Sequence, residues 1–166
     1  MNYEEARVQI KTGDLLAWSS GGWSNWHDIQ VSLVRMFTRS DYSHVGVAWA
    51  DHGRIFIFEA VGTGVRVFPL SRELPCYWVK RPNELGNEAL EWAFSKLGNK
   101  YESKWKMVVD FVKSLRLGEN DRWQCSEYVL GILEQDGEVL TNVATPTGVV
   151  KAAMQRWGSL TFVEAT

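Results

Sequence analysis

The first half of the chain alternates between hydrophobic and polar positions with a period of two, which is typical of half-buried β-strands. Residues 44–49 show the pattern clearly, with two valines and a tryptophan on one side and His44 and Gly46 on the other. A turn at residues 51–54 separates this strand from a returning strand over residues 55–60. The remaining expected strands cover residues 13–18, 64–69 and 76–80.

Beyond Pro82 the apolar residues recur every three or four positions, which is the spacing of amphipathic helices. Another helical stripe lies between the first and second expected strands. The last helix is expected to begin at Thr145 and Pro146, an N-cap residue followed by proline in the first turn. The other helical stripes begin at Asn25, Leu85, Trp105 and Cys125. Strands in one run and helices in another favour an α+β fold, with helices mostly on one face of an antiparallel sheet of about five strands.

The composition is that of a globular protein and argues against several functional classes. The chain has 166 residues, of which 45% are hydrophobic and 23% are charged, so we expect a single domain over residues 1–166. A net charge of -2 provides no basic surface for nucleic acid. No apolar run approaches a membrane span and no signal peptide is recognisable, so we expect no transmembrane segment and a cytoplasmic location. Cys76 and Cys125 are expected to be reduced thiols.

Two polar residues on adjacent strands are expected to face each other. A loop of two or four residues in the turn places His44 and Glu59 on the same face of the hairpin, directly opposite or one diagonal apart. A loop of one or three residues places them on opposite faces. On the same face, the carboxylate orients the imidazole and supports its cationic form. Glu59 also ends an apolar run that is expected to be covered, and a buried glutamate needs a partner.

Cys125 is a candidate nucleophile. It lies in line with Val129 and Ile132 on the apolar side of its expected helix. We expect this side to pack against the face of the sheet that carries His44, where small residues such as Gly46 leave room.

The start of this helix is expected to favour a thiolate. Asp121 and Gln124 have the spacing of a capping box, which predicts that Cys125 lies in the first helical turn. There the helix dipole and a nearby imidazolium both lower the pKa of a thiol. Cys125, His44 and Glu59 would then be the nucleophile, the base and the orienting acid.

Each of these residues also has a purely structural interpretation. A cysteine on an apolar helix face is commonly a buried packing residue, and a histidine on a strand is commonly a satisfied core or edge residue. Cys76, which is followed by two aromatic residues, is interpreted as a packing residue. Cysteine, histidine and glutamate are also zinc ligands, but the three candidates are scattered without a close-spaced pair, which disfavours a metal site.

An ordered set of short motifs resembles a known family. The motifs are GDLL at residues 13–16, YSHVGV at 42–47, FEA at 58–60, LGNKY at 97–101, CSEYV at 125–129 and TP at 145–146. Together they resemble the circularly permuted NlpC-type cysteine hydrolases, the YiiX-like branch of the papain-like superfamily, over roughly residues 13–150. The resemblance implies a permuted papain-like fold with a barrel-like antiparallel sheet, in which the histidine strand precedes the cysteine helix.

The resemblance also implies roles for individual residues. Cys125 matches the nucleophile, His44 the base, Glu59 the residue that orients the imidazole, and Tyr101 an aromatic residue near the site. Relatives cleave or transfer acyl groups across amide or ester bonds, so the implied partner is a peptide, a peptidoglycan fragment or an acyl lipid. No metal or organic cofactor is implied, and a bacterial or phage origin fits.

The chain contains nine tryptophans, and several of them lie in residues 18–26. On the family resemblance this segment is expected near the mouth of a cleft, where Trp23, Trp26 and Tyr42 are candidate substrate-binding residues. Two interpretations remain open for the tryptophan rings, which either hold an acyl chain or a sugar or fill a small core.

The sequence therefore predicts a cysteine-dependent hydrolase or acyltransferase that works through a thioester. The backbone N–H of Cys125, together with Tyr101 or Gln124, is expected to stabilise the oxyanion. The alternative is a catalytically inactive binding or structural protein with the same fold. The reactivity of Cys125 separates the two, because a protein without catalysis has no reason to lower the pKa of that thiol.

Overall fold

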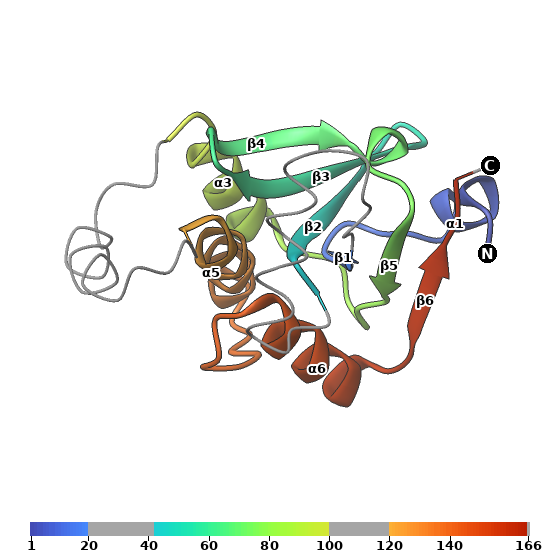
Figure 1. The fold of residues 1–166 in the computed structure, drawn as a ribbon. Helices are drawn as coiled ribbons and strands as arrows, with labels where there is room; N and C mark the ends of the chain where they lie inside the picture. Colours follow the sequence, from blue (N-terminus) through green and yellow to red (C-terminus); the bar gives the residue numbers. More distant parts are fainter. Residues whose placement is uncertain (20–41, 100–119, 166) are drawn as a thin grey trace.

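The computed structural model describes residues 1–19, 42–99 and 120–165, which form an α+β fold (Figure 1). Within these residues six strands form one sheet in the order β4-β3-β2-β1-β5-β6, and every neighbouring pair is antiparallel. The strands are β1 (Leu15–Trp18), β2 (His44–Asp51), β3 (Arg54–Val61), β4 (Gly64–Pro69), β5 (Cys76–Val79) and β6 (Leu160–Val163). None of the described helices has the length and hydrophobicity that crossing a membrane requires.

The sheet is open, so the expectation of a barrel-like sheet is wrong. In the described part of the chain, β4 and β6 are the two ends of the strand order and do not pair with each other. The outer edge of β4 is instead bonded to the chain after α3: the N–H of Gly98 donates to the carbonyl oxygen of Val65 at 3.0 Å. The sequence predicts the first five strands and misses β6, which is only four residues long.

The described helices are α1 (Tyr3–Arg7), the 3-10 helix η1 (Leu70–Arg72), α3 (Asn87–Ser95), α5 (Asn120–Gln135) and α6 (Pro146–Trp157). The predicted stripes from Leu85, Cys125 and Thr145 correspond to described helices, whereas α1 and η1 were not predicted. The predicted start of α6 is confirmed, because the Thr145 hydroxyl accepts a hydrogen bond from the N–H of Gly148 at 3.1 Å. The stripes expected from Asn25 and Trp105 lie outside the described residues.

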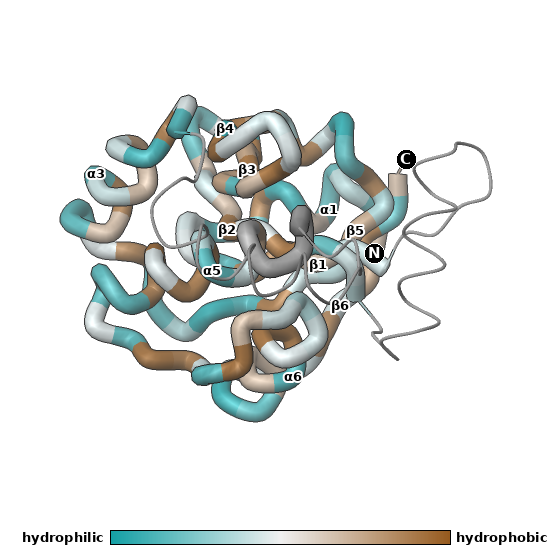
Figure 2. Tube along the Cα trace, turned by 60° about the vertical axis from the view of Figure 1, so that its left-hand side comes forward, coloured by the Kyte–Doolittle hydropathy of each residue, from teal (hydrophilic) through white to brown (hydrophobic). Residues whose placement is uncertain are grey.

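The sheet separates two hydrophobic cores. On one side α3, α5 and α6 pack against residues such as Val45, Val47 and Phe58. On the other side a smaller core combines Leu16 and Ile57 with residues of α1. Hydrophobic segments gather where helices and strands meet, and hydrophilic ones mostly follow the outer turns (Figure 2). Among the described helices, most pack on one face of the sheet, as predicted.

The helix that carries Cys125 packs on the face opposite to the predicted one. Cys125 belongs to the core that contains Val45, whereas His44 and Gly46 lie on the face of β2 that carries Glu59. His44 is the first residue of the strand, and from there it also contacts Cys125. Gly46 is small for a different reason, because a Cβ at this position would lie 2.5 Å from Cγ2 of Ile57. Both faces of β2 are covered, so the alternation of residues alone does not show which face receives the helix.

The β2–β3 hairpin has the loop length on which the predicted pairing depended. Its loop consists of His52 and Gly53, which both have positive φ angles of 46° and 75°. Two consecutive residues of this kind are typical of a type I′ turn. The register that follows from this two-residue loop places His44 and Glu59 on one face, one diagonal apart.

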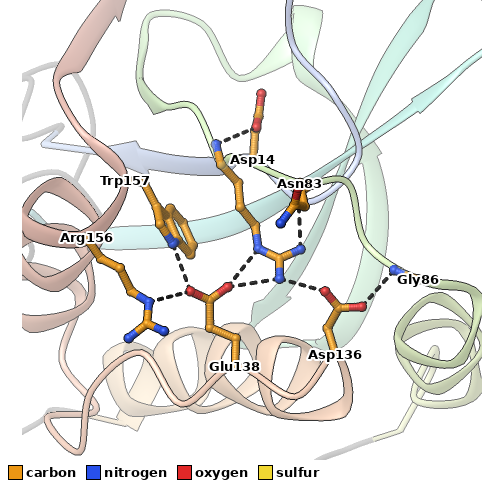
Figure 3. A network of polar contacts seen from close by, with 8 residues as sticks. Asp14, Asn83, Gly86, Asp136, Glu138, Arg156 and Trp157 are labelled. Carbon is orange, nitrogen blue, oxygen red and sulfur yellow. Dashed lines mark hydrogen bonds and ion pairs between the residues drawn. The ribbon is translucent and has the colours of Figure 1, made fainter.

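A network of charged side chains fastens the helices to the sheet (Figure 3). Arg81 follows β5 and is 6% exposed. Its guanidinium contacts Oδ2 of Asp136 at 2.6 Å and Oε2 of Glu138 at 2.9 Å, both just after α5. Asp136 also accepts a hydrogen bond from the N–H of Gly86 before α3, and Glu138 contacts Arg156 at the end of α6. Arg81 thus contacts the end of α5 directly, and through Asp136 and Glu138 it is linked to the start of α3 and the end of α6.

Candidate active site

His44 and Glu59 form the centre of the candidate site. His44 begins β2, and Glu59 lies on the neighbouring strand β3. Nε2 of His44 lies 2.6 Å from Oε2 of Glu59. The side chain of His44 is 24% exposed and that of Glu59 is 2% exposed, so solvent reaches the pair from the imidazole side. The structure brings these two residues together, and it supplies the partner that a buried glutamate was expected to need.

Glu59 has a second cationic partner, which the sequence analysis missed. Arg66 lies opposite Glu59 in the β3–β4 ladder, and its Nε donates to Oε1 of Glu59 at 2.7 Å. Burial raises the pKa of Glu59, but the hydrogen bonds and positive charges of His44 and Arg66 outweigh burial and hold the pKa below its usual value. The register of the second hairpin, applied to the predicted strands 55–60 and 64–69, was the available signal for Arg66.

Cys125 on α5 is hydrogen-bonded to His44 and is 0% exposed. Because Nε2 of His44 faces Glu59, the ring nitrogen that remains for the thiol is Nδ1. Burial raises the pKa of Cys125, but the hydrogen bond and charge of His44, a hydrogen bond from the backbone of Val45 and one from Ser126 together lower it below the usual value. Burial lowers the pKa of His44, yet the contacts with Cys125 and Glu59 raise it to about 10.

Cys76 on β5 shows how burial alone changes the pKa of a thiol that has no imidazole partner. It is 1% exposed and belongs to the smaller core, as expected of a packing residue. Burial raises the pKa of Cys76 to about 12. The two cysteines are equally covered but have opposite pKa shifts, and the difference comes chiefly from the contact between Cys125 and His44.

Cys125 does not lie in the first turn of its helix, contrary to the sequence prediction. Helix α5 begins at Asn120, which places Cys125 in the second turn. The helix dipole acts mainly within the first turn, and N–H groups beyond it are bonded within the helix. The backbone N–H of Cys125 is therefore not available as the predicted oxyanion donor. The side chain of Gln124 lies outside the described residues, and so does Tyr101.

The other predicted residues fall into two groups. Trp23 and Trp26 lie outside the described residues. Trp18, the first of the Trp-rich segment, packs its ring on His44 with 5.3 Å between the ring centroids. The ring of Tyr42 meets that of Tyr77 edge to face at 5.5 Å, in the layer beside the helices. Trp18 is therefore a neighbour of the imidazole, whereas Tyr42 is joined to the core.

The donor atoms of the site do not converge on a point where a metal ion would be held. Across the described ranges there is no group of three or more His, Cys, Asp or Glu residues with that arrangement. His44 stands between Cys125 and Glu59, and the second carboxylate oxygen of Glu59 is taken by Arg66. These three candidate ligands therefore do not fit a metal centre.

Comparisons with known proteins identify the fold. No protein-family model matches the chain, and no curated protein is similar to it. Among solved structures, the chain is similar to the metalloprotein yiiX from Escherichia coli O157:H7, of DUF1105, with a TM-score of 0.54 and 20% sequence identity. The similarity covers 95% of this chain and 89% of that protein. At this identity the likeness shows a YiiX-like fold and nothing about activity.

Proposed function

We propose that this protein is a cysteine-dependent hydrolase or acyltransferase that acts on an amide or ester bond through a thioester. One observation carries the proposal: the imidazole of His44 is hydrogen-bonded on one side to a buried thiol and on the other to a buried carboxylate. A base that contacts a nucleophile and is oriented by a third group is the arrangement on which nucleophilic catalysis depends. In this proposal Cys125 is the nucleophile, His44 the acid and base, and Glu59 the orienting acid.

The proposed reaction has two steps. In the first, the thiolate of Cys125 attacks the carbonyl carbon and forms a C–S bond, the C–N or C–O bond breaks, and Nδ1–H of His44 gives its proton to the leaving amine or alcohol. In the second, His44 takes a proton from water or from an acceptor hydroxyl or amine as that group attacks the thioester. The C–S bond then breaks, and Cys125 leaves as a thiolate beside the cationic imidazole.

The family resemblance adds the class of substrate to this proposal. A permuted NlpC-type enzyme would have the His44 strand before the Cys125 helix, which is the chain order here. Relatives of this type act on peptides, peptidoglycan fragments or acyl lipids. Because a catalytic triad is defined by geometry, the order of its members along the chain leaves the mechanism unchanged.

A binding or structural protein with the same fold is the second candidate, and the complete burial of Cys125 favours it. A thiol that no substrate reaches does no chemistry, whatever its pKa. The two candidates differ in whether Cys125 reacts in the folded protein at a pH where an ordinary thiol is protonated.

The test is alkylation of the intact protein with iodoacetamide, followed by mass spectrometry of each cysteine peptide. Cys76 is the internal control, because it is equally buried and lacks the imidazole. At about pH 6, where an unperturbed thiol with a pKa of about 8.5 is almost fully protonated, we expect Cys125 to react much faster than Cys76. The substitution His44→Ala should remove this advantage. Equal and slow labelling of both cysteines would favour the inactive binding protein.

A further inference from the structure

Arg66 contacts Glu59 of the candidate site and two further residues, Glu73 and Phe68. Its Nε donates to Oε1 of Glu59 at 2.7 Å, and its Nη2 contacts Oε1 of Glu73 at 3.2 Å. The guanidinium also lies over the ring of Phe68, with 4.2 Å to the ring centroid. Three groups on different elements thus hold one cation in a fixed orientation.

These contacts form a closed ring that returns to the imidazole. Nε1 of Trp18 donates to the carbonyl oxygen of Glu73 at 2.5 Å, and the ring of Trp18 packs on His44. Starting from His44, the ring passes through Glu59, Arg66, Glu73 and Trp18. Its members come from β1, β2, β3, β4 and the residue after η1, so the imidazole is fixed by four strands.

We propose that Arg66 is a positioning residue that holds the carboxylate of Glu59 in the orientation that keeps Nε2–H of His44 bonded and Nδ1 facing Cys125. Because it assigns a role at that site, this inference rests on the proposed function. Arginine is always charged and donates in a fixed fork, so it occupies Oε1 in every protonation state of the imidazole. Oε2 is then the oxygen that remains for His44.

Loss of Arg66 would leave Oε1 of Glu59 buried without its partner. A buried carboxylate oxygen in that state either turns toward solvent or takes up a proton. Both changes weaken the 2.6 Å contact between Glu59 and His44 and free the imidazole to rotate. Among the described residues, the titratable groups that contact this pair are Cys125, beside His44, and Arg66, beside Glu59. Glu73 contacts Arg66 and not the pair itself.

The experiment compares Arg66→Met, Arg66→Lys and the exposed control Arg72→Met in the full chain. The first measurement is the NMR signal of the Nε2 proton of His44, and the second is the rate of iodoacetamide labelling of Cys125 relative to Cys76. For Arg66→Met we expect the Nε2 proton to lose its downfield position and Cys125 to label several-fold more slowly at about pH 6. Arg66→Lys should recover part of both signals, and Arg72→Met should match the wild type.

The outcomes separate positioning from a merely structural role. If Arg66→Met lowers the stability of the protein but leaves the Nε2 proton signal and the labelling ratio unchanged, the proposal is wrong. If Arg66→Met does not fold, Arg66→Lys decides: an Nε2 proton signal and a labelling ratio that both equal those of the wild type overturn the proposal, and a partial loss of both supports it. If wild-type Cys125 labels no faster than Cys76, the proposed function fails, while the Nε2 signal still tests the role of Arg66.

Discussion

Arg66 contacts two glutamates that differ in burial. Comparing the two contacts shows how much burial adds to the stability that an ion pair with the same arginine provides. Glu59 is almost fully buried, whereas Glu73 is 38% exposed. The substitution Glu59→Gln keeps the shape of the side chain but leaves one acceptor oxygen where two were used. One of the two charge-assisted hydrogen bonds, from His44 or from Arg66, must then be lost in a buried position.

The expected loss follows from these contacts. A hydrogen bond to a charged group contributes about 1.5–3 kcal/mol, and removing one partner of a buried ion pair costs about 3–5 kcal/mol. We expect Glu59→Gln to lower the free energy of unfolding by about 3 kcal/mol near pH 6. For Glu73→Gln we expect a loss of less than about 1 kcal/mol, because water replaces the exposed contact.

The difference between wild type and Glu59→Gln should also depend on pH. The folded-state pKa of Glu59 is lowered, so its contribution is present above the unfolded pKa of about 4.3 and is lost as the pH falls through the folded value. The folded-state pKa of His44 is raised to about 10, so its contribution is complete below about pH 6.5 and is lost as the pH rises toward 10. The difference should therefore be largest between about pH 5 and pH 6.5.

Urea unfolding followed by tryptophan fluorescence measures both variants across this pH range. Equal m-values would show that the midpoints report stability alone. If Glu59→Gln costs no more than Glu73→Gln, or if the cost is the same at every pH, the assignment of a charged and buried Glu59 is wrong.

Two further substitutions test the packing around the site. Arg81→Met removes the buried cation from two carboxylates and should cost about 3 kcal/mol in urea unfolding, whereas Arg156→Met, on the exposed side of the same network, should cost less than about 1 kcal/mol. Equal losses would contradict the burial argument. Gly46→Ala introduces a Cβ 2.5 Å from Cγ2 of Ile57 and should cost about 1–3 kcal/mol. The double variant with Ile57→Ala should lose less than the sum of the single variants, and simple additivity would show that the crowding is relieved elsewhere.

The pairing of His44 with Glu59 could be predicted from the sequence because a hairpin converts loop length into register. A two-residue turn leaves little freedom, and the side-chain period of two then fixes which residues share a face. Arg66 follows from the same rule in the next hairpin, where it lies opposite Glu59. The register of a hairpin predicts contacts only between the two strands that the turn connects.

The position of α5 could not be predicted in the same way. Its packing face depends on which side of the sheet the intervening chain crosses, and β2 offers an apolar surface on both sides. The start of α5 also differs from the prediction: the capping spacing of Asp121 and Gln124 predicts a later start than Asn120, and Cys125 lies in the second turn and not in the first. The open sheet has a similar explanation, because a short strand such as β6 carries too little pattern to reveal what pairs at an edge.

The sheet lies between the two hydrophobic cores, and the candidate site lies where β2 begins. Cys125 is held by the core beside the helices, whereas Trp18, which packs on His44, belongs to the core on the opposite side. The thiol and the imidazole therefore take their positions from two sets of packing contacts that share only the strands between them. The hydrogen bond between Cys125 and His44 therefore depends on the alignment of both cores with the sheet.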